Sequence, residues 1–450
     1  MFRRLLVANR GEIARRIIRA AHSLGVEAVA VYSEADRDAP FVREADRSSC
    51  IGPPQAARSY LDADAIIQAA IQTEAQAIHP GYGFLSENAI FAQRVMEQRI
   101  AWIGPPPRVI RLMGEKASAK VAANAAGLPV IPGSNGLVSS VREALEVAET
   151  VGWPVLLKAD AGGGGRGMRR ADDRGSLESA FLAASAEARA AFGSGALYVE
   201  KLLGSARHIE FQVLVDKYGN AIHLFERECS VQRRHQKLLE EAPSSILEDA
   251  RRRSMGQLVA NAIAKLGYVG AGTVELLLER ETNQLFFIEM NTRLQVEHPV
   301  TEMITGIDLA AAQIRIAAGE RLWIQQRDVR IDGHAIELRL CAEDPEDGFK
   351  PTPGVVTTFE VPSGTRGEGK VRVDSAVESG SRIPPYYDSL IAKLIAWAPT
   401  RDGAIETARA ALADARIEGV STTAILHKAI LGAHDFRAGD LTIGVIPGWT

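Results

Sequence analysis

The sequence is poor in cysteine, in long apolar runs and in charge of one sign. Its three cysteines, Cys50, Cys229 and Cys341, form no CxxC pair, which excludes a disulfide framework and a structural zinc site. Each is predicted to be a small core residue. No apolar run approaches the roughly 18 residues that span a bilayer, and the N-terminus lacks the apolar region of a signal peptide. These absences predict a cytoplasmic protein without membrane contact.

The charge is nearly balanced, with 52 basic and 56 acidic side chains and a net charge of −4. Proteins that bind nucleic acid through its phosphates need a basic surface, so no nucleic-acid partner is expected. With 450 residues, 46% of them apolar, the chain is long enough for two or three packed domains.

The beginning of the chain reads as a β-α-β unit. Residues 4–8 predict a buried strand, the apolar stripe from Ile13 to Leu24 predicts a helix, and residues 26–32 predict a second strand. Such a start is typical of a doubly wound α/β domain with a parallel sheet. The glycine pattern of a dinucleotide-binding turn is missing after the first strand, so this unit is interpreted as structural.

Three domains are expected. An N-terminal α/β domain covers 1–113, a linker helix with a small α/β insert covers 114–203, and a strand-rich remainder covers 204–450. The linker helix is predicted near 108–127. The remainder is predicted to hold strands at 207–215, 221–226, 272–278 and 285–290, helices at 250–266 and 306–319, a strand pair at 333–341 and 354–360, and a last helix at 402–416.

A glycine-rich loop, residues 162–167, follows the predicted strand 154–159. Successive glycines can present backbone N–H groups to phosphate oxygens without a side-chain clash. The loop is neither a Walker A motif nor part of a kinase signature, and a mobile lid over the phosphates of a nucleotide explains it better than a plain linker. Lys158, at the end of an apolar strand, is predicted to have a phosphate partner.

The segment from Phe287 to His298 carries the densest polar pattern. Read at the strand period of two, one face would hold Glu289, Asn291, Arg293, Gln295 and Glu297.

A turn centred on Thr282 would place Glu275 directly opposite Glu289. Two facing carboxylates repel each other unless a cation lies between them, and all-oxygen ligands with Asn291 nearby favour Mg²⁺ or Mn²⁺. The alternative is a pair of solvated acids on an edge hairpin. Further along, the alternating segment 333–340 puts Glu337 and Arg339 on one face.

Six motifs together resemble the biotin carboxylase family, in the same order and over residues 1 to about 440. They are Ala8–Ala14, His79–Asn88, Gly163–Met168, Ser230–Lys237, Glu289–Pro299 and Tyr386–Lys393. The resemblance implies an α/β and α+β protein of the ATP-grasp fold. Its parts would be a doubly wound parallel N-terminal domain, a small mobile lid and a C-terminal domain with a mixed or antiparallel sheet.

The resemblance also assigns site residues. Those implied to contact ATP are Lys116, Lys158, Gly164, Gly165, Glu200, Lys201, Leu202, Leu203, His208, Gln232, His235, Glu275 and Glu289. Glu275, Glu289 and Asn291 would hold two magnesium or manganese ions. Bicarbonate would be surrounded by Lys237, Arg293, Gln295 and Val296.

The catalytic residues implied by the resemblance are Lys237, Arg293, Glu297 and Arg339. Glu297 would be the general base, and Arg339 would stabilise the biotin enolate. The activity implied is the ATP-dependent carboxylation of biotin by bicarbonate through carboxyphosphate, the first half-reaction of an acyl-CoA carboxylase, with acetyl-CoA the favoured acceptor and fatty acid synthesis the setting.

The implied partners are a biotin carboxyl carrier protein, carboxyltransferase subunits and a second copy of the chain. No methionine is followed by lysine, so the biotin attachment site is expected on another chain or a missing segment. The alternatives are another ATP-grasp carboxylate–amine ligase, the equivalent part of a propionyl-CoA, pyruvate or urea carboxylase, and a catalytically silent nucleotide-binding subunit.

Overall fold

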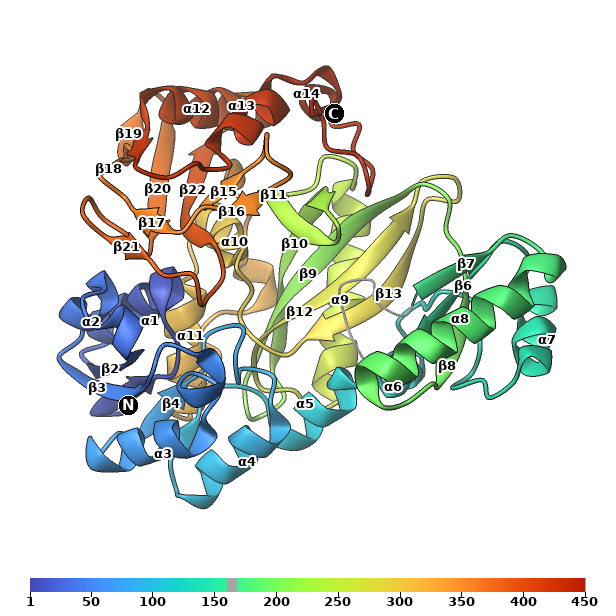
Figure 1. The fold of residues 1–450 in the computed structure, drawn as a ribbon, viewed down its shortest axis with the longest axis horizontal. Coiled ribbons are helices and arrows are strands. Elements are labelled where there is room, and N and C mark those ends of the chain that lie inside the picture. Colours follow the sequence, from blue (N-terminus) through green and yellow to red (C-terminus); the bar gives the residue numbers. More distant parts are fainter. Residues whose placement is uncertain (160–167, 450) are drawn as a thin grey trace.

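The computed structural model describes residues 1–159 and 168–449. Figure 1 shows three bodies around a central sheet: an N-terminal domain, a small domain in teal and green that projects from one side, and a C-terminal domain in orange and red. Within the described ranges, none of the helices is both long and apolar enough to cross a bilayer.

The N-terminal domain is built on a five-stranded parallel sheet in the order β3-β2-β1-β4-β5. Along β1, Leu5 and Val7 join the core beneath α1, while Leu6 faces the opposite core. Helices therefore cover both faces, which confirms the doubly wound prediction. The elements are β1 (Arg4–Val7), α1 (Gly11–Ser23), β2 (Glu27–Ser33), α2 (Pro40–Glu44), β3 (Arg47–Gly52), α3 (Ala63–Gln72), β4 (Ala77–His79), α4 (Ala89–Glu97) and β5 (Ala101–Trp102).

The predicted linker helix is two helices, α5 (Pro107–Gly114) and α6 (Lys116–Ala126), because Glu115 between them has the extended backbone conformation φ −97°, ψ 111°. The small domain follows as a three-stranded antiparallel sheet in the order β7-β6-β8 with two helices on it. Its elements are α7 (Val141–Val151), β6 (Val155–Ala159), β7 (Met168–Ala171), α8 (Arg174–Phe192) and β8 (Leu197–Lys201).

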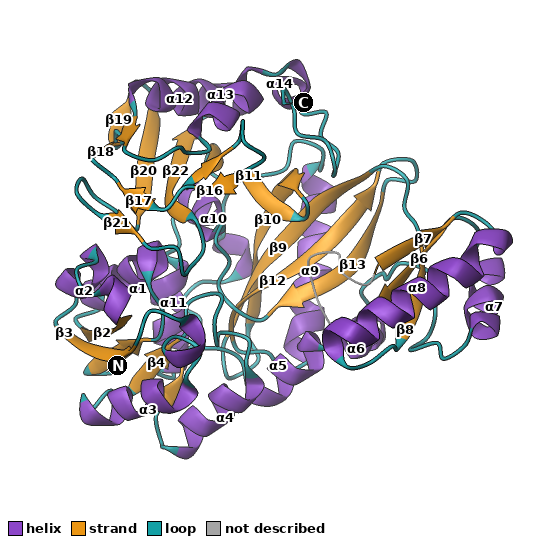
Figure 2. Cartoon of the chain, in the orientation of Figure 1, coloured by secondary structure: helices purple, strands orange, loops and turns teal. Residues whose placement is uncertain are grey.

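A nine-stranded sheet joins the centre of the molecule to the C-terminal domain, in the order β13-β12-β9-β10-β11-β14-β22-β20-β19 (Figure 2). Every neighbouring pair is antiparallel. Its strands are β9 (Ala206–Val215), β10 (Ala221–Arg233), β11 (Gln236–Ala242), β12 (Gly270–Glu279), β13 (Gln284–Asn291), β14 (His334–Cys341), β19 (Gly364–Arg366), β20 (Gly369–Ser375) and β22 (Leu390–Ala398).

Helices α9 and α12 each cover one end of this sheet, over separate apolar cores. The helices of this half are α9 (Asp249–Lys265), α10 (His298–Thr305), α11 (Leu309–Ala317), α12 (Arg401–Asp414), α13 (Ala424–Gly432) and α14 (His434–Ala438). Short strand pairs complete it: β15 (Glu343–Asp344) with β16 (Lys350–Pro351), β17 (Gly354–Val355) with β21 (Arg382–Ile383), and β18 (Thr358–Glu360) with β23 (Arg416–Glu418).

Several sequence predictions are wrong in detail. The strand expected at 354–360 is the two pieces β17 and β18, and neither pairs with β14. Strand β11 was not anticipated, because charged side chains interrupt its apolar pattern. Helix α10 was not anticipated either, because its first residue, His298, was read as the end of the alternating segment 287–298. Cys50 is exposed, whereas Cys229 and Cys341 are buried as expected.

Candidate active site

A cavity of about 1130 Å³ opens where the three bodies meet. The sequence-predicted residues that line it are Lys116, Lys158, Lys201, Leu202, Leu203, His208, Gln232, His235, Lys237, Glu275, Glu289, Asn291, Arg293, Gln295, Val296 and Arg339. Glu200 and Glu297 lie behind this wall and are bonded to residues in it. Gly164 and Gly165 fall outside the described residues.

The pairing of Glu275 with Glu289 is confirmed, although the hairpin reaches it by a different route. Near the turn the strand pairing is shifted by one residue from the predicted register, so that Leu276 lies opposite Phe287. A bulge at Ile288 then restores the predicted register, and Glu275 faces Glu289. A bulge places two adjacent side chains on one side of the strand, and both Ile288 and Glu289 line the cavity.

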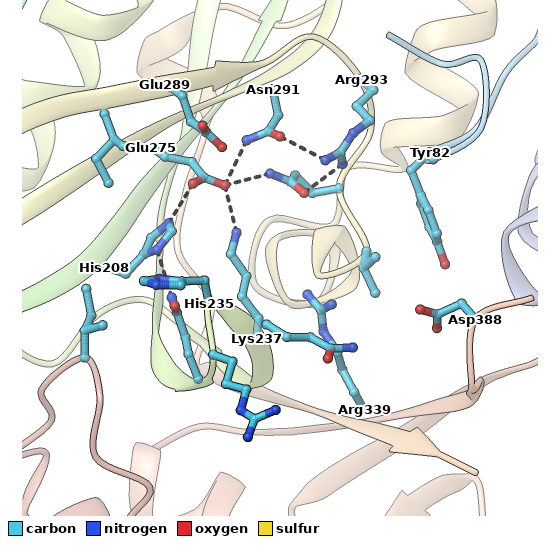
Figure 3. A pocket seen from close by; sticks show the side chains of 18 of the residues that line it. Tyr82, His208, His235, Lys237, Glu275, Glu289, Asn291, Arg293, Arg339 and Asp388 are labelled. Carbon is cyan, nitrogen blue, oxygen red and sulfur yellow. Dashed lines mark hydrogen bonds and ion pairs between the residues drawn. The ribbon is translucent and has the colours of Figure 1, made fainter. Parts of the chain in front are cut away.

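The expected strand face beyond Asn291 is wrong. Strand β13 ends at Asn291, residues 292–297 form an irregular segment, and Glu297 is the N-cap of α10. The polar side chains still converge on the cavity, because the chain turns across the end of the sheet instead of continuing along it (Figure 3).

Glu275 is buried and accepts hydrogen bonds from three side chains. Lys237 Nζ lies 2.9 Å, Asn291 Nδ2 2.8 Å and Gln295 Nε2 3.1 Å from its Oε1. His208 Nε2 lies 3.2 Å from Oε2. Burial by itself raises the pKa of Glu275, but Lys237 and His208 outweigh it and hold this pKa well below 4.5.

Glu289 differs, because burial and then the neighbouring charge of Glu275 raise its pKa. An ionised Glu289 beside an ionised Glu275 calls for a further positive charge, and carboxylate oxygens with an amide oxygen are suited to a hard divalent cation. The donor set of Glu275, Glu289 and Asn291 therefore fits the predicted metal. In this structure the amide of Asn291 is turned elsewhere, with Arg293 Nη2 2.9 Å from its Oδ1.

Lys237 stands at the centre of the acidic residues. Its Nζ lies 2.6 Å from Glu210 Oε2 and 2.6 Å from Glu297 Oε1, in addition to its bond to Glu275. Burial lowers the pKa of Lys237, but Glu210, Glu275 and Glu297 raise it far more, so the ammonium remains charged. Because Gln232 pairs with Lys237 across β10 and β11, the turn between these strands sets its position.

That turn consists of Arg234 and His235, both at positive φ (48° and 66°). Two such residues form the tight hairpin turn that matches the twist of the flanking strands. The turn carries His235 into the cavity wall.

Arg339 connects the base candidate Glu297 to a second acid, Glu240. Its Nη2 lies 3.0 Å from Glu297 Oε2, and its Nε lies 2.7 Å from Glu240 Oε1. Burial raises the pKa of Glu297, but Lys237 and Arg339 together hold it below 4.5, so Glu297 is ionised and able to accept a proton. Sequence reasoning missed Glu240.

Arg293 is positioned by an acid from the N-terminal domain. Its Nε donates to Glu87 Oε2 at 2.8 Å, and its Nη1 donates to Gln295 Oε1 at 2.9 Å. Glu87 also accepts from the backbone N–H of Thr292 at 3.0 Å. Glu87 lies within one of the matched motifs, which was the only signal that could have drawn attention to it.

At the end of the cavity next to the small domain, Lys158 is paired with an acid, and its predicted phosphate contact stays a prediction. Its Nζ lies 2.5 Å from Glu200 Oε2, and Lys120 Nζ lies 2.8 Å from Glu200 Oε1. Lys120 is a functional candidate that sequence reasoning missed. Nearby, Gln232 Nε2 lies 2.9 Å from His208 Nδ1, and Glu275 is among the causes that raise the pKa of His208 to about 9 despite its burial.

The arrangement places phosphate-compatible lysines at one end of the cavity, paired acids in the middle, and a buried base between two cations at the other end. Such a site can bind a polyphosphate with a metal ion and deprotonate a small acid beside it.

Comparison with known proteins identifies the family of the chain. Residues 1–110 match the family model "Biotin carboxylase, N-terminal domain", and residues 337–447 match "Biotin carboxylase C-terminal domain". Residues 115–325 match "Carbamoyl-phosphate synthase L chain, ATP binding domain". The biotin carboxylase of Nostoc sp. is 52% identical over 445 residues, which are 99% of this chain and 98% of the relative.

Two solved structures share the fold over nearly the whole chain. One is the biotin carboxylase βγ-ATP complex from Campylobacter jejuni, with 44% identity, a TM-score of 0.93 and 98% of each chain covered. The other is the biotin carboxylase domain dimer of Hydrogenobacter thermophilus 2-oxoglutarate carboxylase, in complex with MgADP, ADP and bicarbonate. It has 50% identity and a TM-score of 0.92, and the match covers 98% of this chain and 96% of that chain.

Proposed function

Because the chain belongs to the biotin carboxylase family, an ATP-grasp family of ATP-dependent ligases, we propose that it performs the first half-reaction of an acyl-CoA carboxylase. In that half-reaction, ATP and bicarbonate carboxylate biotin on a biotin carboxyl carrier protein. The observation that carries the proposal is the contact of Glu297 with both Lys237 and Arg339, beside the paired acids.

Glu297 is placed to take the proton of bicarbonate. It is ionised, fully buried and held by Lys237, so a bicarbonate bound among Lys237, Arg293 and Gln295 would meet a base without competing water. The bicarbonate oxygen then attacks the γ-phosphorus of ATP, giving ADP and carboxyphosphate, in a reaction that depends on positioning and on compensating charge.

Lys116, Lys158 and Lys201 line the cavity where the triphosphate would lie. Magnesium, when bound, would offset charge on the transferring phosphoryl group, and Glu275, Glu289 and Asn291 are the residues that would hold it.

Carboxyphosphate breaks down to CO₂ and phosphate, and the released phosphate takes the N–H proton of the ureido group of biotin. Negative charge develops on the ureido oxygen as this proton leaves, and the ureido nitrogen then attacks CO₂ to form carboxybiotin. Arg339 is suited to stabilise this negative charge, because its guanidinium is always charged and is fixed by Glu240 and Glu297.

The test is ATP cleavage measured with and without bicarbonate and free biotin. We expect turnover that requires bicarbonate and rises with biotin, and carboxybiotin formation that Arg339→Ala abolishes. An ATP-grasp carboxylate–amine ligase would not need Arg339, and a silent nucleotide-binding subunit would show no turnover. ATP cleavage indifferent to both bicarbonate and biotin would refute the proposal.

For the acceptor of the whole enzyme we propose acetyl-CoA, to which carboxyltransferase subunits in the cytoplasm would transfer the carboxyl group from biotin. A second candidate is 2-oxoglutarate, because a biotin carboxylase domain from a 2-oxoglutarate carboxylase shares 50% identity with the chain. Purification of the biotinylated partner complex, followed by assays with both acceptors, distinguishes acetyl-CoA from 2-oxoglutarate.

We also propose a homodimer, in line with the dimer found for the biotin carboxylase domain of that 2-oxoglutarate carboxylase.

A further inference from the structure

Two buried carboxyl groups face each other directly behind Arg339. Glu240 on β11 is the cross-strand partner of Glu337 on β14, and both side chains have 0% exposure. Directly opposed residues of an antiparallel pair have Cβ atoms about 5 Å apart. Arg339 lies two residues after Glu337 and on the same face of β14, so all three side chains share one side of the sheet.

Three of the four carboxyl oxygens of the pair lack a hydrogen-bond donor among the described residues. Among the described residues, no donor reaches Glu240 Oε2 or either oxygen of Glu337. A buried carboxylate without donors is costly, whereas a protonated carboxyl supplies its own O–H to a neighbour. One proton between the two groups would satisfy an oxygen on each residue.

Cations surround the pair, but none of them donates to these three oxygens. From β22, Lys393 Nζ donates to Val296 O at 2.8 Å and lies 3.1 Å from Glu12 Oε1 on α1. From β11, Lys237 is bonded to Glu210, Glu275 and Glu297. From β14, Arg339 donates to one oxygen of the pair, Oε1 of Glu240.

Acidic groups face the pair as well. Glu297, at the start of α10, adds to the burial that raises the pKa of Glu240 to about 7. Burial, followed by the charges of Glu240 and Glu297, raises the pKa of Glu337 well above 4.5, although Lys393 and Arg339 oppose this. Tyr82, whose hydroxyl is bonded to Glu12, also faces Glu337, and the buried thiol of Cys229 on β10 faces Glu240. A raised pKa for both Glu240 and Glu337 is expected of two interacting acids that share a proton.

We propose that Glu240 and Glu337 share one proton and act as positioning residues for Arg339. Glu337 keeps the proton and donates it to Glu240 Oε2, and the ionised Oε1 of Glu240 holds the Nε edge of the guanidinium. The Nη1 edge, which has no partner among the described residues, remains for the developing oxyanion of biotin. The inference rests on the proposed biotin carboxylation.

The first experiment looks for the proton itself. The infrared spectrum of the purified protein at neutral pH should contain the C=O band of a buried protonated carboxyl, and that band should be lost in Glu337→Gln. The matched control is Glu241→Gln, the next residue along β11, which is equally buried but ionised beside His334 and Arg401. This variant should keep the band. A spectrum unchanged by Glu337→Gln would overturn the proposal.

The second experiment measures the biotin-dependent rate relative to bicarbonate-dependent ATP cleavage without biotin. Glu337→Gln, a neutral isostere that still donates, should keep this ratio within about threefold of wild type, whereas Glu240→Gln should lower it by about tenfold or more, as expected for a lost bond to a charged group. The proposal would be refuted if Glu240→Gln had the same ratio as wild type, or if Glu240→Gln and Glu337→Gln lowered the ratio equally.

The pH profile separates positioning from a merely structural role. Glu337→Leu removes the donor to Glu240, so the pKa of Glu240 should rise and the acid limb of the ratio should move to higher pH by about one unit. An unmoved limb would count against the proposal. If the wild type shows no turnover dependent on bicarbonate and biotin, the proposed function has failed instead, and the infrared result decides on the pair independently.

Discussion

Lys237 Nζ lies 2.6 Å from Glu297 Oε1, in a part of the cavity wall where both side chains are shielded from water. Burial alone would raise the pKa of Glu297, and Lys237 is the largest opposing influence. The proposed base is therefore kept ionised by a neighbour that is itself proposed to contact bicarbonate.

Lys237→Met should impair the base as well as substrate binding. Without the ammonium, the pKa of Glu297 rises, so the acid limb of bicarbonate-dependent ATP cleavage should move to higher pH, and the rate near pH 7 should fall by roughly tenfold or more. The measurement is the pH–rate profile, with exposed Lys265→Met on α9 as the control. A lower rate with an unshifted limb would mean that Lys237 contributes only to binding.

Glu289→Gln should relieve the repulsion from Glu275 and weaken the metal site. Because the pKa of Glu289 is raised by burial and by Glu275, the metal-free variant should unfold with a free energy higher than wild type by on the order of 1 kcal/mol. The stabilisation by magnesium with ADP should shrink correspondingly. Denaturant unfolding with and without these ligands tests both effects. Equal magnesium stabilisation of the two proteins would place the metal elsewhere.

Lys120→Met should weaken ATP binding although sequence patterns did not select this residue. Lys120 and Lys158 hold the two oxygens of Glu200, which is almost fully buried, and the loss of one cation leaves part of its charge uncompensated. We expect the KM for ATP to rise by about tenfold, with little change in the KM for bicarbonate. A uniform fall in kcat with both KM values unchanged would contradict this role.

Glu241 should make the free energy of unfolding depend on pH in the acid range. Burial raises its pKa, but His334 and Arg401 lower it from 4.5 to about 2. A group whose pKa is depressed in the folded state stabilises the protein above its unfolded pKa and loses that effect as pH falls through the folded value, so about 3 kcal/mol is at stake between pH 4.5 and 2. The difference in unfolding free energy between wild type and Glu241→Gln should shrink progressively below pH 4.5. A constant difference down to the acid unfolding limit would contradict the assignment.

Local patterns predicted much of the fold and failed where geometry depends on distant segments. The β-α-β start and the long strands β9 and β12 follow from the apolar pattern of the sequence, because each position that faces the core needs an apolar side chain. The helix break at Glu115 and the bulge at Ile288 interrupt patterns that read as continuous, so nothing in the local sequence marked them. The facing of Glu275 and Glu289 was predicted correctly, with the hairpin turn misplaced by half a residue.

The sequence by itself determined the alternation of apolar and polar side chains, and with it the parallel first domain, the facing acids of the β12–β13 hairpin and the motifs of the family. Only the tertiary structure decided that Glu87 supports Arg293, that Lys120 holds Glu200, and that Glu240 and Glu337 meet behind Arg339. The physical reason is that periodicity reports which side of an element faces the core, whereas a buried charge takes its partner from whichever element folds against that side.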